Sequence, residues 1–146
     1  MRILGLDFGD KTIGVAVSDP FGWTAQGLCV IPRENPNAFK KPMNELSTII
    51  TEKEVETIVL GFPKNMDNTE GSRCAKTEDF AERIRKRFPK IPVILWDERL
   101  STVAANRTLM EGNLSRMERK SVIDKMAAVH ILQGYLDKLA NEKKEQ

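Results

Sequence analysis

Two short, largely apolar runs stand near the start of the chain. Arg2–Phe8 is nearly unbroken in its apolar character, and Thr12–Ser18 is rich in β-branched and apolar residues. Runs of this length are typical of strands that are buried on both faces. Only about three residues around Gly9 separate the two runs, so the pattern predicts a hairpin. A turn at Asp19–Gly22 and a third strand over Gln26–Ile31 complete three antiparallel strands.

Helical and strand periods then alternate along the rest of the chain, after a proline-bearing loop over Pro32–Pro42. In chain order the predicted elements are a helix around Met43–Ile50, a strand over Thr57–Leu60, a helix around Phe80–Phe88, a strand over Val93–Trp96, a helix over Thr102–Met110 and a long helix over Arg119–Leu139. An antiparallel meander followed by alternating helices and strands predicts an α/β fold. Its sheet is mixed, with helices on both faces, which is the ribonuclease H-like layout.

The length and composition fit one folded domain. The chain has 146 residues, of which 40% are hydrophobic and 30% charged, as in soluble globular proteins. We expect the domain to span residues 1–140, with a charged, frayed tail over residues 141–146. No apolar run approaches the roughly 18 residues that a membrane span needs, which also argues against a signal peptide. Cys29 and Cys74 are too far apart for a CxxC site, so we expect a reducing cytoplasm.

The histidine count excludes several kinds of catalytic site. His130 is the only histidine, so the sequence rules out sites that need two or more imidazole groups, such as HExxH zinc hydrolases. The 21 Asp and Glu residues instead supply oxygen ligands, which suit Mg²⁺ or Mn²⁺. The net charge of +2 says little about partners on its own, because acids and bases can occupy separate surfaces.

Asp7 occupies a costly position, at the end of an otherwise apolar strand. A buried carboxylate without a partner destabilises the folded state, so this side chain needs a compensating interaction. One interpretation is a turn former that hydrogen-bonds to the backbone around Gly9. The other is a metal ligand, with Gly9 allowing a phosphate or a metal to approach the backbone.

A second pair of acids, Asp97 and Glu98, directly follows the apolar segment Val93–Trp96. Because side chains alternate along a strand, only one of the two is expected to enter a site shared with Asp7. The alternative is an ion pair between one of these acids and Arg99 at the end of the strand.

A third acid, Asp124, lies in the last predicted helix on a face that is otherwise apolar. Its neighbours at helical spacing are Ala127, Ala128 and Ile131. The small alanines would let the helix lie close to the strands and bring Asp124 toward the strand ends that carry the other acids. The alternative is an ion pair with Arg119 or Lys120, which would require a helix face turned to solvent.

The unfavourable location of each of the three acidic positions is accounted for if together they bind divalent cations. Two hard cations roughly 3.5 to 4 Å apart can activate water and stabilise the leaving oxygen in phosphodiester displacement. Basic residues near the acids could then hold a polyanion. Those that stand out are Lys64, Arg73, Lys76, Arg116, Arg119, Lys120 and Lys125. We expect the further basic run Arg83–Arg87 to form a solvated outer helix face.

Four blocks of the sequence are distinctive in combination. They are Gly5–Gly9 with Ile13–Ala16, Val59–Met66, Asp97–Thr102, and Ile123–Ala128 with Ile131–Leu136. Together, in this order and spacing, they resemble the YqgF (RuvX) family over nearly the whole chain. That family was named for Holliday junction resolvases and is linked to maturation of the 5′ end of 16S ribosomal RNA. Any one block is less specific, because a strand ending in Asp and Gly also opens actin-like and Hsp70-type ATPases.

The resemblance implies a ribonuclease H-like nuclease that depends on Mg²⁺ or Mn²⁺. The catalytic metal ligands that it implies are Asp7, Asp124 and one acid of the pair Asp97 and Glu98. Of that pair we prefer Glu98. The family's Gly-Phe-Pro loop, here residues 61–63, would lie beside the same site. The substrate contacts that we expect are Lys64, Asn65, Arg99 and Lys120.

The leading functional hypothesis is a cytoplasmic nuclease that processes the 5′ end of precursor 16S ribosomal RNA. Its partner would be this RNA or the pre-30S particle, and we expect a monomer or weak homodimer that binds no membrane. One alternative is a Holliday junction resolvase that acts on branched DNA. Another is a non-catalytic, RNA-binding assembly factor, but the presence of all three acidic positions argues against a protein without catalysis. An actin-like ATPase would close two related domains around a nucleotide, whereas this chain holds one copy of the motif.

Overall fold

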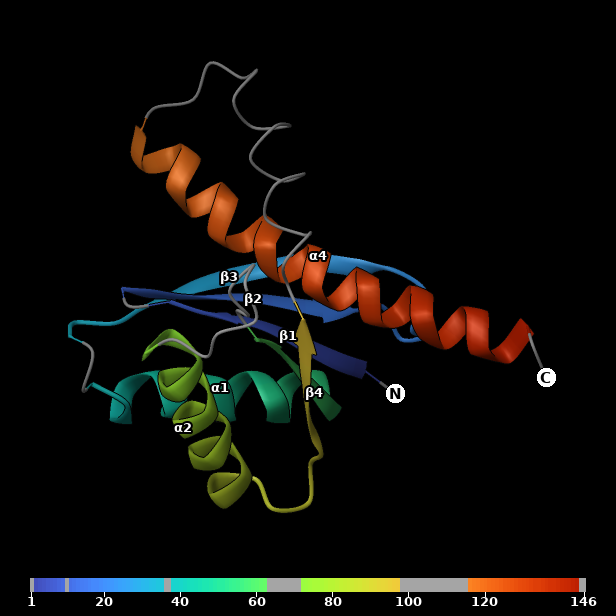
Figure 1. Ribbon diagram of the computed structural model, residues 1–146, viewed down its shortest axis with the longest axis horizontal. Helices are drawn as coiled ribbons and strands as arrows, with labels where there is room; N and C mark the ends of the chain where they lie inside the picture. Colours follow the sequence, from blue (N-terminus) through green and yellow to red (C-terminus); the bar gives the residue numbers. More distant parts are fainter. Residues whose placement is uncertain (1, 10, 36–37, 63–71, 98–115, 145–146) are drawn as a thin grey trace.

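The computed structural model describes residues 2–9, 11–35, 38–62, 72–97 and 116–144 (Figure 1). Within helices, it does not describe the side chains of residues 72–74, 116–124 and 143–144. The strands in these segments are β1 (Arg2–Phe8), β2 (Thr12–Ser18), β3 (Ala25–Pro32), β4 (Val55–Phe62) and β5 (Val93–Asp97). The helices are α1 (Lys40–Lys53), α2 (Ser72–Arg87) and α4 (Arg116–Lys144). The predicted helix over Thr102–Met110 lies outside the described residues.

The five strands form one mixed sheet in the order β3-β2-β1-β4-β5. The pairs β1–β2 and β2–β3 are antiparallel, whereas β1–β4 and β4–β5 are parallel. This confirms the predicted meander of three antiparallel strands followed by parallel strands. Parallel neighbours require crossover connections, and α1 and α2 provide them here.

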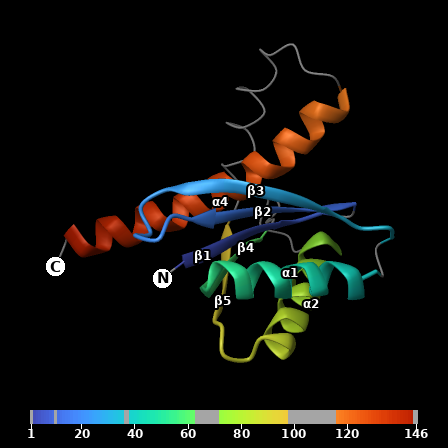
Figure 2. The same cartoon turned by 180° about the vertical axis from the view of Figure 1, so that it is seen from behind.

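The two faces of the sheet carry different helices, as the two opposite views in Figures 1 and 2 show: α1 and α2 lie on one side and α4 on the other. Alternation along β1 divides the core accordingly. Leu4, Leu6 and Phe8 belong to the cluster under α1 and α2. Ile3 belongs to a second cluster, together with Ala128 and other residues of α4.

Several elements begin or end elsewhere than expected. Helix α1 begins at Lys40, ahead of the expected Met43, and its first turn accommodates Pro42 because backbone N–H groups there have no partner within the helix. Strand β4 runs to Phe62, past the expected stop at Leu60, because Gly61 and Phe62 pair with β5. Helix α4 continues through residues 141–144, which we expected to form a charged tail. No helix among the described residues is long and apolar enough to cross a membrane.

The turn between β2 and β3 is closed by one carboxylate. Asp19 accepts hydrogen bonds from the backbone N–H groups of Phe21 and Thr24, each at 2.7 Å, and from the Thr24 hydroxyl at 2.7 Å. These bonds, that of the Thr24 hydroxyl above all, lower the pKa of Asp19 to about 2. The aromatic side chains of Phe21 and Trp23 in this turn are exposed.

Candidate active site

The carboxyl ends of three parallel strands meet at one edge of the sheet. Leu6 of β1 pairs with Leu60 of β4, and Phe62 of β4 pairs with Asp97 of β5. Asp7 therefore stands at the same edge as Asp97, with strand β4 between them. Crevices at the carboxyl ends of parallel strands are common ligand sites in open α/β sheets.

Asp7 lies on the face of the sheet that α4 covers. Gly5, two residues earlier and on the same face, is in direct contact with α4. The Asp7 residue is half-buried and pairs across the ladder with Gly14 of β2. The N–H of Gly9 donates to the carbonyl oxygen of Thr12 at 2.9 Å, so the turn after β1 is closed by backbone groups.

Gly9 itself has a local structural role. A Cβ atom at this position would stand 3.0 Å from the carbonyl oxygen of Thr12, so the tightness of the hairpin is a sufficient reason for glycine here. The carbonyl oxygen of Gly9 also accepts a hydrogen bond from the guanidinium of Arg33. These contacts explain Gly9 without invoking a phosphate or a metal at its backbone.

Asp97 lies on the opposite face of the sheet from Asp7. Trp96, the residue before it, packs into the cluster under α4, with its ring edge-on to Tyr135 at 6.0 Å between centroids. Alternation turns the exposed Asp97 to the side of α1 and α2, in register with Phe62. Glu98 lies outside the described residues.

Helix α4 crosses β1 at very short range. A Cβ atom at Gly5 would stand 2.7 Å from Cβ of Leu132 and 3.1 Å from the carbonyl oxygen of Ala128. The C-terminal end of α4 and the start of β1 lie at the same side of the molecule in Figures 1 and 2, so the two run in opposite directions. Asp124 is on α4, one helical turn before Ala128 and therefore toward the Asp7 end of β1.

The family model described as "RuvX: Holliday junction resolvase" matches residues 1–138 of this chain. The chain belongs to the RuvX family. Among its relatives is a protein of Desulforamulus reducens, 57% identical over 137 residues, which cover 94% of this chain and 97% of the relative. Another, from Agathobacter rectalis, is 52% identical over 143 residues, covering 98% and 99%. Both carry the name "Putative pre-16S rRNA nuclease".

Solved structures of resolvases share the fold of this RuvX-family chain. RuvC of T. thermophilus, in complex with a Holliday junction substrate, matches with a TM-score of 0.57 at 11% identity, covering 96% of each chain. The Holliday junction resolvase of fowlpox virus matches with a TM-score of 0.57 at 13% identity, covering 95% of this chain and 99% of the other. These likenesses confirm the ribonuclease H-like fold, and the chain is a member of a nuclease family.

The structure describes only part of the site that the sequence predicts for this RuvX-family protein. Asp7 and Asp97 are described, and the backbone of Asp124 and Lys120 is in α4. Lys64, Asn65, Glu98 and Arg99 lie outside the described residues. Within the described part, no three His, Cys, Asp or Glu residues are grouped to hold a metal ion, and that part omits Glu98 and the side chain of Asp124.

One residue that positions the site was missed by reasoning from the sequence. The apolar pattern places Gly5 within β1 but does not predict its contact with another element, yet α4 touches the strand at this residue. The available signal was a glycine within a buried strand, which often marks the close approach of another backbone.

Proposed function

We propose that this protein is a divalent-metal-dependent nuclease that processes the 5′ end of precursor 16S ribosomal RNA. Membership of the RuvX family and the names of its relatives support a nuclease. The observation that carries the proposal is the contact of α4 with Gly5, because it brings the helix that contains Asp124 over the strand that contains Asp7. Precursor 16S ribosomal RNA is found in the cytoplasm, either free or in a pre-30S particle. We therefore place the protein in the cytoplasm.

The spacing along the two elements supports a shared site for Asp7 and Asp124. Starting from the contact between Gly5 and Ala128, Asp7 is two residues further along β1, a rise of about 6.6 Å. Asp124 is one turn back along α4, a rise of about 5.4 to 6 Å. Because the two elements run in opposite directions, both steps lead toward the same end of the sheet.

Alternation along β5 favours Glu98 as the third ligand. Asp97 faces the side of α1 and α2, away from Asp7, whereas a residue one step further along an extended chain returns to the face of Trp96 and α4. We therefore assign the ligand set to Asp7, Glu98 and Asp124. Three carboxylates form an all-oxygen donor set, which suits Mg²⁺ or Mn²⁺.

The bound cations would supply Lewis acidity for phosphodiester hydrolysis. The chain's own residues would provide the rest of the catalytic arrangement. The backbone of Asp7 is fixed by the β1 ladder, and that of Asp124 by the packing of the helix against Gly5, so both residues stand on regular structure. Lys64, Asn65, Arg99 and Lys120 would contact the phosphates of the substrate.

The experiment that tests this proposal compares two substrates under three metal conditions. Purified protein is incubated with precursor 16S ribosomal RNA and with a four-way DNA junction, each with Mg²⁺, with Mn²⁺ or with EDTA. We expect the RNA to be cut near its mature 5′ end with either metal and to stay intact with EDTA. RNA binding without cleavage would favour the assembly factor, and symmetric cutting of the junction alone would favour the resolvase.

Asp124→Asn is the critical variant, and Asp137→Asn is its matched control on the same helix. Asp137 is exposed and lies more than three turns further along α4. We expect Asp124→Asn and Asp7→Asn to abolish cleavage, and Asp137→Asn to retain it. Retention of cleavage by either of the first two variants would show that the ligand set is wrong.

A further inference from the structure

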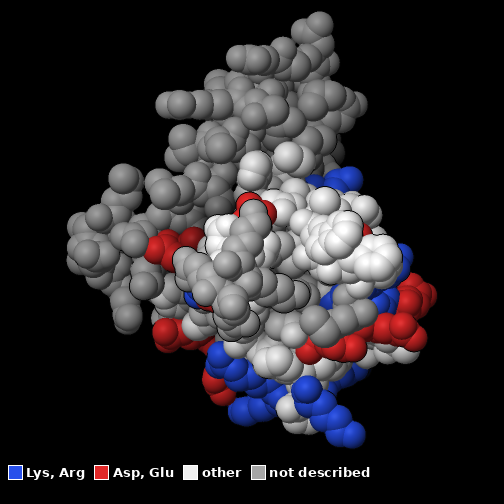
Figure 3. Space-filling model, turned by 90° about the vertical axis from the view of Figure 1, so that its right-hand side faces the viewer, with Lys and Arg blue, Asp and Glu red and all other residues white. Residues whose placement is uncertain are grey.

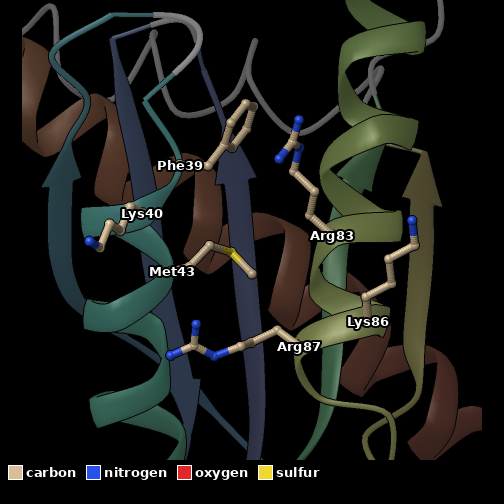
Figure 4. A pocket seen from close by; sticks show the side chains of 6 residues that line it. All are labelled: Phe39, Lys40, Met43, Arg83, Lys86 and Arg87. Carbon is tan, nitrogen blue, oxygen red and sulfur yellow. The ribbon is translucent and has the colours of Figure 1, made fainter.

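An open groove separates α1 from α2 on the face of the sheet opposite α4. It has a volume of about 480 Å³ and is lined by Phe39, Lys40, Met43, Arg83, Lys86 and Arg87. Figure 4 shows Arg83 and Arg87 extending from α2 toward α1, with Met43 between the two helices and Lys40 and Lys86 at the sides. Four of the six lining residues are cations, and none is an acid. The basic residues of the run 83–87 are exposed, as expected for a solvated helix face, and Arg83, Lys86 and Arg87 among them line this basic groove.

The charge of the basic groove is only partly compensated. Arg83 has one ion pair, from its Nε to Asp79 at 3.0 Å, and both side chains are about half exposed, so water screens the pair. Arg87 donates to the side-chain oxygen of Asn44 at 3.1 Å, which is a neutral partner. Lys40 and Lys86 form no ion pair among the described residues. A net positive charge therefore remains in the groove.

The start of α1 adds to this positive potential. Its first turn contains Lys40 and Lys41 but no acid, and its N-cap residue Phe39 provides no side-chain hydrogen bond. The N-terminal end of a helix carries a partial positive charge, so lysines there are unfavourable unless an anion is nearby. At the other wall, the last turn of α2 is also basic. Figure 3 shows Lys and Arg gathered at the lower end of the molecule, the height at which α2 ends in Figure 1.

Aromatic contacts hold the groove in shape and connect it to the candidate active site. The guanidinium of Arg83 lies over the ring of Phe39, 4.0 Å from its centroid, which limits the rotation of this arginine. Phe39 in turn stacks on Phe8, with 6.4 Å between centroids, and Phe8 directly follows Asp7 in β1. The groove therefore begins beside the sheet edge at which Asp7 stands.

We propose that the basic groove binds the phosphate backbone of the nucleic acid substrate beyond the cleavage site. The strand would leave the Asp7 face, cross the edge of the sheet past Phe8 and enter between α1 and α2. Guanidinium groups bind phosphates through paired N–H donors, and Arg83 and Arg87 are one helical turn apart on the same wall. This inference rests on the proposed function, since it assumes a polynucleotide substrate.

The test measures binding in EDTA, so that it does not depend on cleavage. The probe is a fluorescein-labelled single-stranded RNA of about 20 nucleotides, long enough to exceed a typical single-strand site. The groove variant is Arg83→Gln/Arg87→Gln. Its matched control, Arg85→Gln/Lys90→Gln, removes the same charge from exposed residues that do not line the groove. Fluorescence anisotropy gives Kd at several salt concentrations.

We expect the groove variant to bind about tenfold more weakly than the wild type at low salt, and the control to differ less than twofold. The slope of log K against log salt should decrease in magnitude by about 1.4 in the groove variant alone, because each phosphate contact on a single strand contributes about 0.7. Equal Kd values and equal slopes for the two double variants would overturn the inference, because net charge alone would then explain any loss.

Failure of this inference can be told apart from failure of the proposed function. If the wild type cuts precursor RNA and the two double variants bind alike, only the groove assignment is wrong. The other outcome is that the wild type cuts no RNA, while the groove variant still binds RNA more weakly and with a smaller salt dependence than the control. In that case the basic groove binds RNA and the proposed nuclease activity is wrong. Circular dichroism melting of both double variants establishes that they are folded.

Discussion

Gly5 of β1 lies directly against Leu132 of α4, so closely that a Cβ atom at Gly5 would stand 2.7 Å from the Cβ of that leucine. Neither atom belongs to the flexible end of a side chain, so a substitution here must displace the helix or the strand. Displacement of α4 would move Asp124 away from Asp7. This contact therefore links the packing of the core to the proposed metal site.

We expect Gly5→Ala to lower the free energy of unfolding by about 1 to 3 kcal/mol, which is typical of an overpacked core. It should also reduce cleavage more than its stability loss explains. Gly27→Ala is the matched control, because the nearest atoms to its Cβ would belong to side chains, of Lys125 at 3.1 Å and of Val129 at 3.6 Å. Urea unfolding measures both variants. A Gly5→Ala protein as stable and as active as Gly27→Ala would contradict this account.

The two acids after β5 should respond differently to neutralisation. Asp97 is exposed on the side of α1 and α2, whereas we assign Glu98 to the metal site. We expect Glu98→Gln to abolish metal-dependent cleavage and Asp97→Asn to retain most of it. Single-turnover cleavage of precursor RNA measures both. The opposite pattern would mean that the chain leaves β5 without continuing the strand alternation.

The sheet could be predicted from the sequence because its central strands carry an uninterrupted apolar pattern. The predicted bounds of β1 and β2 agree with the structure, and β3 differs by one residue at each end. The pattern predicts that β4 stops before Gly61 and does not define where α1 begins, because glycine and proline favour irregular backbone in isolation. Here β5 pairs with Gly61, and the first turn of a helix accommodates Pro42.

The basic groove could not be predicted in the same way. The spacing of Arg83 and Arg87 indicates one face of a helix, but it does not reveal what stands opposite that face. The opposite wall comes from Phe39 and Lys40, more than 40 residues earlier in the chain. Similarly, Gly5 signals a close approach without identifying Ala128 and Leu132 as its neighbours. Local sequence patterns predict where helices and strands occur. Which of them lie against each other depends on tertiary packing, which these patterns do not contain.

The turn between β2 and β3 should weaken in acid. The pKa of Asp19 is about 2 in the folded protein, below its ordinary value of 3.8, so its ionised form stabilises the fold above about pH 4. That contribution is lost as the pH falls through about 2. Thr24→Val removes the hydroxyl donor, and we expect the pKa of Asp19 to rise toward its ordinary value. NMR titration of the Asp19 carboxyl checks this, and an unchanged pKa in the variant would contradict it.

Magnesium should stabilise the folded wild-type protein. A cation that binds only the folded state raises the free energy of unfolding by about 2.7 kcal/mol at a hundred times its Kd. Asp7→Asn should reduce this increase, and its metal-free form should be at least as stable as the wild type, because clustered carboxylates repel one another without a cation. Thermal melting with and without several millimolar Mg²⁺ measures both effects. Equal shifts in wild type and variant would count against Asp7 as a ligand.

The oligomeric state distinguishes the two activities associated with the family. Symmetric cutting of a four-way junction requires two active sites related by a two-fold axis, whereas trimming an RNA end requires one. A stable dimer buries about 800 Å² on each partner. Among the described residues, the exposed large hydrophobic side chains are Phe21, Trp23 and Leu95, and only Phe21 and Trp23 are adjacent, with 5.4 Å between ring centroids. Such a pair covers too small an area to form that interface by itself.

We therefore expect a monomer or weak dimer that prefers RNA and loses affinity steeply as salt rises, as phosphate-dominated binding does. Sedimentation velocity measures the first property, with Phe21→Ser/Trp23→Ser as the variant that removes the exposed aromatic pair. Competition between labelled precursor RNA and an unlabelled four-way junction measures the second. A tight wild-type dimer that cuts junctions symmetrically and leaves precursor RNA intact would replace the RNA-processing proposal with junction resolution. If the Phe21→Ser/Trp23→Ser variant is then still a dimer, the dimer interface lies elsewhere on the chain.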